Sequence, residues 1–242
     1  MYNFLKSKIS VKIKANLKNL IKHSKTRSFK EFSFKESFLR HNSQYSENEA
    51  FNREFEYHKI SDAHTEQKKG YLNNIYEQPN SVGYFLDNNR NISKLIDIGS
   101  GTGWFVNYVS KNHQEFKNII AIEPSKFAIK IAQKIYKHDI KIEYKNGFTD
   151  EELKQIDKDI YLITTFAVFL HLNYIYTKKV LKILNNSINK DSILIFNEPI
   201  AKSRYERFNL HYPRSKKFWI KNLKHFEVNF YNDNLIVARK IV

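Results

Sequence analysis

Apolar and polar positions divide the chain into a polar N-terminal part and a C-terminal part where short apolar runs alternate with longer amphipathic ones. The short runs are rich in β-branched residues and predict strands at 95–98, 119–123, 140–144, 160–164 and 193–196. The longer runs repeat apolar residues every three or four positions and predict helices at 104–113, 126–137, 151–156 and 174–186. This alternation indicates a parallel sheet with helices on both faces.

The end of the chain has a different pattern. "HFEVNFYNDNLIVARK", residues 225–240, alternates apolar and polar positions on both sides of Asn232, Asp233 and Asn234. Two alternating strands joined by a short Asn/Asp turn predict a β-hairpin. We therefore expect five parallel strands followed by a terminal hairpin, in an α/β fold without internal repeats.

Before residue 91 the chain is predicted to be an extension and a cap. Residues 1–38 carry a basic amphipathic pattern whose apolar positions lie three or four residues apart: Ile9, Ile13, Leu17, Leu20 and Ile21. Such a helix suits an anionic bilayer, RNA or the protein's own core, and the pattern alone leaves these open. Residues 39–90 are polar and locally acidic at first, then helical in pattern, with Pro79 breaking or starting a helix. The third predicted unit is residues 91–242.

Charge and composition narrow the class of protein. The formal net charge is +16, and residues 1–30 supply +9 of it, from eight lysines and Arg27 without any acid. This favours anionic partners, although lysine-rich surfaces also arise from AT-rich coding sequences. The absence of cysteine excludes disulfides, thiolate metal sites and cysteine nucleophiles. With no apolar run of about 18 residues and no secretory signal pattern, we expect a cytoplasmic protein.

The strongest motif is "LIDIGSGTGWFVNYV", residues 95–109, which holds three of the six glycines. A phosphate-binding P-loop would need Lys and then Ser or Thr after its last glycine, but Trp104 and Phe105 follow Gly103. The dinucleotide motif GxGxxG would need glycine at position 104. Asp97 would repel a pyrophosphate but suits a ligand that carries a sulfonium and an ammonium group. Glu123, at the end of the next strand, is placed to accept hydrogen bonds from ribose hydroxyls.

With these residues, 91–242 resemble a class I S-adenosylmethionine-dependent methyltransferase of the small-molecule and glycan-modifying branch. "LIDIGSGTG" is similar to the first motif of that superfamily and "IIAIEPS" to its acid-ended second strand. The resemblance implies a Rossmann-like seven-stranded sheet of order 3-2-1-4-5-7-6, strand 7 antiparallel, with helices on both faces and here an N-terminal helical extension. It also implies that the methionine part of S-adenosylmethionine binds at Asp97, Gly99, Gly101 and Gly103, and its ribose at Glu123.

The segment after the third strand departs from that family. Where an acid for the adenine amino group is commonest, "EYKNGFTDEE" has Gly147. Asn146 or Asp150 is the expected substitute, with Phe148 beside the adenine ring.

The acceptor side is predicted at the carboxyl ends of the fourth and fifth strands, where open α/β sheets bind ligands. His171 is a candidate general base, or a residue that shapes the cofactor pocket. Glu198 is a second candidate, as a base, as a group that orients the acceptor, or as a partner of backbone amides near Pro199. Basic and aromatic residues that follow suit a phosphate and a planar or sugar ring, unless they form only a solvated basic face: Arg204, Tyr205, Arg207, Tyr212, Arg214 and Trp219. No pattern predicts a metal site.

The leading hypothesis is O-methylation of a small phosphorylated, nucleotide-linked or cell-surface glycan acceptor, for example a polysaccharide precursor. Contact of residues 1–30 with the inner membrane surface would suit a lipid-linked acceptor. An RNA methyltransferase is the first alternative, because of the charge, although no RNA-binding module is recognisable. A non-catalytic binding protein with a relic methyltransferase fold is the second.

Overall fold

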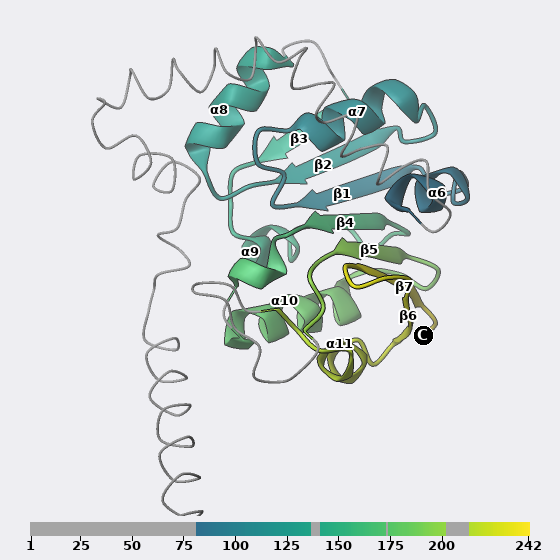
Figure 1. Ribbon diagram of the computed structural model, residues 1–242. Helices are drawn as coiled ribbons and strands as arrows, with labels where there is room; N and C mark the ends of the chain where they lie inside the picture. The colour runs from purple at the N-terminus through teal and green to yellow at the C-terminus, as the bar shows by residue number, and fades with distance from the viewer. Residues whose placement is uncertain (1–80, 137–140, 173, 202–212) are drawn as a thin grey trace, which may run out of the picture.

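The computed structural model describes residues 81–136, 141–172, 174–201 and 213–242, except for the side chain of His171 (Figure 1). The predicted extension 1–38, most of the cap 39–90, and Arg204, Tyr205, Arg207 and Tyr212 lie outside these residues. Its strands are β1 (Lys94–Ile98), β2 (Asn118–Ile122), β3 (Ile142–Lys145), β4 (Leu162–Phe166), β5 (Ile193–Asn197), β6 (Phe226–Phe230) and β7 (Leu235–Lys240).

These strands form one seven-stranded sheet in the order β3-β2-β1-β4-β5-β7-β6. The pairs among β1 to β5 are parallel, whereas β7 runs antiparallel to both β5 and β6. Both the predicted strand order and the antiparallel β7 are confirmed. β1, β2, β4 and β5 are buried along almost their whole length, as expected for central parallel strands covered on both faces.

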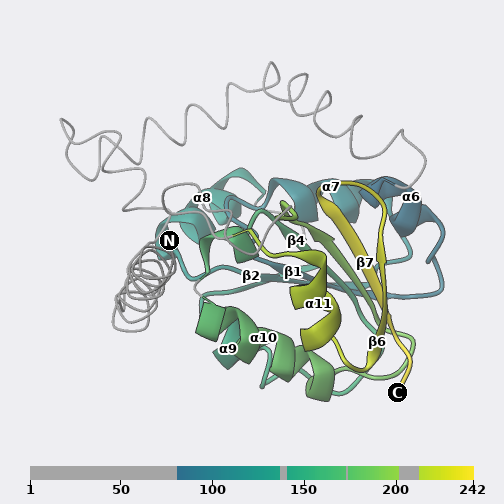
Figure 2. The same ribbon diagram turned by 60° about the horizontal axis from the view of Figure 1, so that its bottom comes forward.

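Helices cover both faces of the sheet (Figure 2). The first face carries α6 (Val82–Asp87), α7 (Trp104–Asn112) and α8 (Lys126–Ile135), and the second carries α9 (Thr149–Glu152), α10 (Tyr174–Ser187) and α11 (Lys216–Asn222). Successive residues of β1 pack on opposite faces: Leu95 contacts the core beneath α6 and α7, and Ile96 contacts the core beneath α10 and α11. The two cores explain why the central strands are apolar at consecutive positions.

Two elements escaped the sequence analysis, the short 3-10 helix η1 (Phe169–His171) and α11. Tertiary packing stabilises both: the ring of Trp219 in α11 lies 5.4 Å from that of Phe169 and 5.6 Å from that of Phe196 in β5. Ser215 caps α11 by accepting the amide of Phe218. The predicted helix at 151–156 is observed as α9, two residues earlier at its start and shorter.

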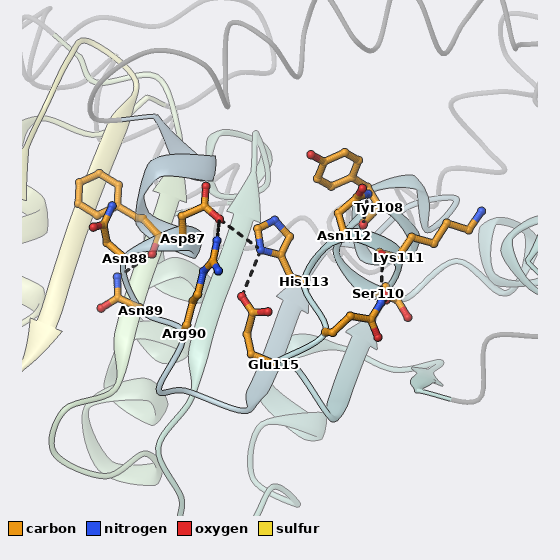
Figure 3. Close-up of polar contacts among 12 residues, drawn as sticks. Asp87, Asn88, Asn89, Arg90, Tyr108, Ser110, Lys111, Asn112, His113 and Glu115 are labelled. Carbon is orange, nitrogen blue, oxygen red and sulfur yellow. Dashed lines mark hydrogen bonds and ion pairs between the residues drawn. The ribbon is translucent and has the colours of Figure 1, made fainter.

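The division predicted at residue 90 remains a prediction, but α6 lies before it and packs into the same core as β1 and α7, through Val82, Phe85 and Leu86. Asp87, at the end of α6, also faces the far end of α7 (Figure 3). There the buried His113 has Nδ1 3.3 Å from Glu115 and 3.8 Å from Asp87, and Asp87 pairs with Arg90 at 3.1 Å. α7 starts at the glycine loop and ends at this cluster. The cluster therefore lies at the end of the sheet opposite to the glycine loop.

Within the described residues, no helix is both long and apolar enough to cross a bilayer. Those residues also contain no group of three or more His, Asp or Glu side chains arranged to hold a metal ion.

Candidate cofactor and acceptor site

The glycine loop connects β1 to α7 and is held against the end of β2. The amides of Gly99 and Ser100 donate to the carbonyl of Ile122 at 2.8 and 3.1 Å, and the amide of Gly103 donates to Ser100 at 2.9 Å. The loop is therefore a tight turn at the carboxyl end of two buried strands, where open α/β sheets bind ligands.

The glycines of this loop differ in what surrounds them. A Cβ atom at Gly99 would meet Val168 at 2.5 Å, and one at Gly103 would meet Tyr144 at 2.7 Å, so packing requires glycine at both positions. A Cβ atom at Gly101 would meet no atom of the described residues within 4 Å, although φ there is +55°. The backbone at Gly101 is thus left open to a ligand. Ser100 Oγ is buried and has no hydrogen-bond partner among the described residues, which adds a polar group to the loop.

Asp97 lies beneath this loop on β1 and is buried. Its Oδ1 accepts a hydrogen bond from the hydroxyl of Thr164 in β4 at 2.7 Å. The pKa of Asp97 is raised to about 7, mainly because the carboxyl group is buried; the hydrogen bond from Thr164 opposes this shift and the charge of Glu123 adds to it. A cation bound at the loop would stabilise the ionised carboxylate.

The raised pKa of Asp97 predicts a pH dependence of stability that can be measured without any ligand. Because the folded protein keeps a proton that the unfolded chain releases, the contribution of Asp97 to the free energy of unfolding is full below about pH 4 and is lost as pH rises through about 7. We expect Asp97→Asn to flatten the pH dependence in this window by up to about 1.4 kcal/mol per pH unit. Urea denaturation between these pH values measures the slope. Glu227→Gln, at an exposed site, serves as the control, and equal slopes for wild type and Asp97→Asn would contradict the assignment.

Glu123 follows β2 and joins the glycine loop to α8. Its Oε2 accepts the amide of Gly101 at 3.0 Å, and its Oε1 accepts the amide of Ser125 at 2.8 Å. Burial raises the pKa of Glu123, and these two bonds oppose the shift. Because a carboxylate oxygen accepts more than one hydrogen bond, the predicted ribose contact is compatible with this arrangement and remains a prediction.

The segment after β3 lies beside Glu123. The Asn146 side chain donates to the carbonyls of Glu123 and Pro124 at 3.0 and 3.1 Å, and the half-buried Phe148 precedes α9. The Glu152 carboxylate occupies the space that a side chain at position 147 would need. This segment therefore packs closely without an acid at Gly147.

The Asp150 carboxylate does not replace the missing acid for the adenine amino group, because it is bonded elsewhere. The carboxylate is buried, accepts the hydroxyl of Tyr176 at 2.6 Å and pairs with Lys179, both from α10. Burial alone would raise the pKa of Asp150, but the bonds to Lys179 and Tyr176 outweigh it, and the pKa is lowered. Asp150 instead joins α9 to α10.

Glu198 follows β5 and organises the turn after β4. Its Oε1 accepts the Thr165 hydroxyl at 2.9 Å and the Val168 amide at 2.7 Å, and its Oε2 accepts the Leu170 amide at 3.1 Å. The bonded amides belong to the turn after β4 and not to the neighbourhood of Pro199. Burial raises the pKa of Glu198 to about 7, and the hydrogen bonds oppose the shift. Since His171 ends the same turn, the carboxylate holds the backbone that presents it.

The same turn contains a constrained residue. Ala167 has a φ of +56°, which is uncommon for a residue with a Cβ atom, and its amide donates to Asn197 at 2.9 Å. Val168 follows and lies against Gly99. The turn after β4 is therefore held by β5 on one side and by the glycine loop on the other. It brings the glycine loop close to the carboxyl ends of β4 and β5, where the acceptor substrate is predicted to bind.

Within the described part of the chain, the predicted acceptor-binding residues are Trp219, which is buried in α11, and Arg214, which is also buried. Its Nη2 donates to the carbonyl of Leu172 at 2.6 Å and to the Thr177 hydroxyl at 3.2 Å. These bonds hold the start of α10 and do not direct the guanidinium toward solvent. Arg214 also pairs through its backbone with Ile200 and Ala201, so the described residues on the two sides of 202–212 lie next to each other.

Sequence reasoning missed several residues that build this site. Thr164 and Thr165 are polar positions in an otherwise apolar strand, which was a usable signal, and Ser125 fits the pattern of a helix N-cap. Val168 carried no signal, because only its approach to Gly99 makes it important.

Known structures have a similar fold. Human N-acetylserotonin methyltransferase, in complex with SAM, is 12% identical, with a TM-score of 0.51 over 63% of this chain and 49% of that one. Phosphoethanolamine N-methyltransferase 1 of Haemonchus contortus is 17% identical, with a TM-score of 0.50 over 62% and 39%. A SAM-dependent methyltransferase of Archaeoglobus fulgidus is 14% identical, with a TM-score of 0.51 over 62% and 87%.

At these identities the likeness shows the fold, and the chain spans half or less of the first two proteins. No curated protein matches the sequence. A family described as a methyltransferase domain matches residues 70–234, which is more than half of the 242 residues, and the chain belongs to that family.

Proposed function

We propose that this protein transfers the methyl group of S-adenosylmethionine to an oxygen atom of a small phosphorylated, nucleotide-linked or glycan acceptor. The observation that carries the donor assignment is the space beside Gly101, a residue whose amide is bonded to Glu123 and where no described atom lies within 4 Å of a Cβ, at the carboxyl edge of a methyltransferase fold. Human N-acetylserotonin methyltransferase was crystallised with SAM and the Haemonchus contortus enzyme with S-adenosylhomocysteine, which supports the same cofactor here.

Each group of the donor site has a role that follows from its position. The loop from Gly99 to Gly103 receives the methionine part, Asp97 supplies negative charge below it, and Glu123 accepts hydrogen bonds from the ribose. Asn146 and Phe148 line the adenine side. When bound, the cofactor supplies an electrophilic methyl group for in-line displacement. The protein's main contribution is to position donor and acceptor, and to exclude water from the cleft.

A hydroxyl acceptor must lose a proton, and the turn after β4 is the proposed place for this. His171 ends η1 at this edge and is the proposed general base. The alternative role for His171, shaping the cofactor pocket, predicts a different response to substitution. Glu198 is proposed as the positioning residue for this turn, because its oxygens already bind Thr165, Val168 and Leu170.

The acceptor class follows from charge. Arg204 and Arg207, with Tyr205 and Tyr212, are proposed to bind an anionic acceptor, because the segment that contains them begins and ends beside this edge. RNA is the second candidate, favoured by the net charge of +16 and by basic segments at both ends of the sequence. The proposed setting is the cytoplasm, which agrees with the absence of cysteine from the sequence.

The test is to incubate the protein with methyl-labelled S-adenosylmethionine and a source-cell extract, then separate RNA, protein, lipid-linked and small-molecule fractions. Nuclease-resistant label in the small-molecule or glycan fractions, including lipid-linked glycans, is the expected result. Nuclease-sensitive label in RNA would overturn it.

His171→Ala tests the proposed base. We expect turnover to fall by roughly 100-fold while S-adenosylhomocysteine affinity is unchanged, because the base acts only on the acceptor. Turnover with the purified acceptor and calorimetric titration measure the two quantities. A variant that is fully active, or that loses cofactor affinity as well, would assign His171 to the pocket.

A further inference from the structure

The outer surfaces of α10 and α11 carry lysines and exposed aliphatic residues without any acid. Their sequences, residues 174–187 and 216–222, contain no Asp or Glu. Thr177, Val180, Leu181 and Leu184 of α10, and Phe218 and Trp219 of α11, are buried against the sheet. Both helices lie on the same face of the sheet (Figure 2). Their exposed residues are therefore on the outer side of this layer, facing away from the sheet.

The two helices form one continuous surface. The rings of Tyr174 and Phe218 lie 5.0 Å apart, and Asn185 of α10 donates to the carbonyl of Asn222 at 2.8 Å. We define the α10–α11 face by the exposed residues of both helices: Tyr174, Ile175, Lys178, Lys179, Lys182, Asn186, Lys216, Lys217, Ile220 and Lys221.

Exposed isoleucines distinguish this face from an ordinary solvated surface. Ile175 and Ile220 are each 56% exposed, and both lie among lysines. Lysine stems can lie along apolar surface while the ammonium groups reach a polar layer, so this combination suits an interface that is apolar below and anionic above. Lys179 pairs with Asp150 of α9, and the other five lysines add to the positive field.

We propose that the α10–α11 face docks the protein on an anionic lipid bilayer, with Ile175 and Ile220 entering the interface. RNA fits this face less well, because single-stranded RNA is bound by stacking on exposed aromatic or Arg groups. The face has no arginine, and the Tyr174 ring already contacts Phe218 and lies 4.5 Å from the Lys178 ammonium.

Docking on this face would bring the bilayer close to the acceptor edge, which is the carboxyl end of β4 and β5. Both helices begin near that edge, α10 after η1 and α11 after Arg214. The bilayer would therefore lie near the carboxyl ends of β4 and β5, where the acceptor is proposed to bind, which favours a lipid-linked acceptor. This consequence rests on the proposed function, whereas docking itself does not require methyl transfer.

The experiment uses the full chain and sedimentation with vesicles of phosphatidylcholine, with or without phosphatidylglycerol. We expect Ile175→Ser/Ile220→Ser to lower partitioning onto anionic vesicles roughly tenfold. Lys178→Glu/Lys182→Glu/Lys217→Glu/Lys221→Glu should lower it by at least about 100-fold. Matched controls on other surfaces, Ile160→Ser/Ile241→Ser and Lys111→Glu/Lys117→Glu/Lys126→Glu/Lys130→Glu, should change it less than about twofold.

All variants keep residues 1–30, so any binding by that basic segment is common to them. Thermal melting and S-adenosylhomocysteine titration report folding and the donor site separately, and neither should change in the isoleucine variant. Wild-type binding by both face variants would overturn docking. A loss in the lysine variant alone, matched by an equal loss of RNA binding, would assign the face to RNA and also overturn it.

Discussion

Replacing Gly101 with valine is expected to weaken S-adenosylhomocysteine binding by more than about 100-fold, the largest single effect at the donor site. The backbone at Gly101 has a φ of +55°, which a β-branched residue adopts only with strain. The valine side chain would also enter the open space above the loop, since no described atom lies within 4 Å of a Cβ there. Both effects oppose a ligand that needs close contact with this backbone.

Calorimetric titration measures the affinity, and thermal melting establishes that the variant is folded. Gly101→Asn separates the two causes, because asparagine tolerates positive φ better than other residues with a Cβ atom but still fills the space. We expect Gly101→Asn to fold close to normally and still to bind weakly. Ordinary binding by folded Gly101→Val would refute the donor site.

Replacing Glu198 with alanine is expected to lower the free energy of unfolding by about 3 kcal/mol or more, and to reduce turnover strongly. The change leaves the partly buried amide of Val168, the buried amide of Leu170 and the Thr165 hydroxyl without their acceptor. Those amides belong to the turn that ends at His171, so its backbone should relax. Cofactor affinity should fall less, because the loop at Gly101 is held by Ile122 and Glu123.

Two further variants distinguish positioning from proton transfer. Glu198→Gln keeps one acceptor oxygen, so a positioning role predicts an intermediate loss of both stability and kcat. Thr165→Val removes one donor to the carboxylate without changing charge, and should cause a smaller, parallel loss. Urea denaturation and single-turnover rates measure the two effects. If Glu198→Gln kept full stability but lost turnover entirely, Glu198 would instead act as the base.

The parallel strands could be predicted because their sequences are short, β-branched and apolar on both faces, a pattern that local composition reveals. α11 could not be predicted in the same way, since its seven residues lie in a basic region and one of its two buried aromatic residues, Trp219, packs on β5 and η1. Helices of this length are marginal without tertiary contacts. Their existence is therefore decided by the core.

At the site, the residue types were readable but their partners were not. Asp97, Glu123 and the glycines followed from one motif and its spacing. The hydrogen bonds of three residues could not be predicted from the sequence. Glu198 accepts from a turn about 30 residues earlier, Asp150 interacts with Tyr176 and Lys179, and Arg214 donates to the carbonyl of Leu172. Each of these contacts joins elements that only the folded sheet brings together.

The sequence by itself determined the class of fold and the position of the glycine loop, because these depend on local periodicity, on glycine and on connections between neighbouring elements. The order of the strands followed only from the resemblance of two motifs to a known superfamily. The tertiary structure alone decided which polar groups remain open to a ligand. No described atom fills the space beside Gly101, whereas the guanidinium of Arg214 is buried and hydrogen-bonded. Both outcomes are set by residues distant in the chain. The α10–α11 face is likewise visible only once packing has turned the apolar sides of both helices inward and left Ile175 and Ile220 outside.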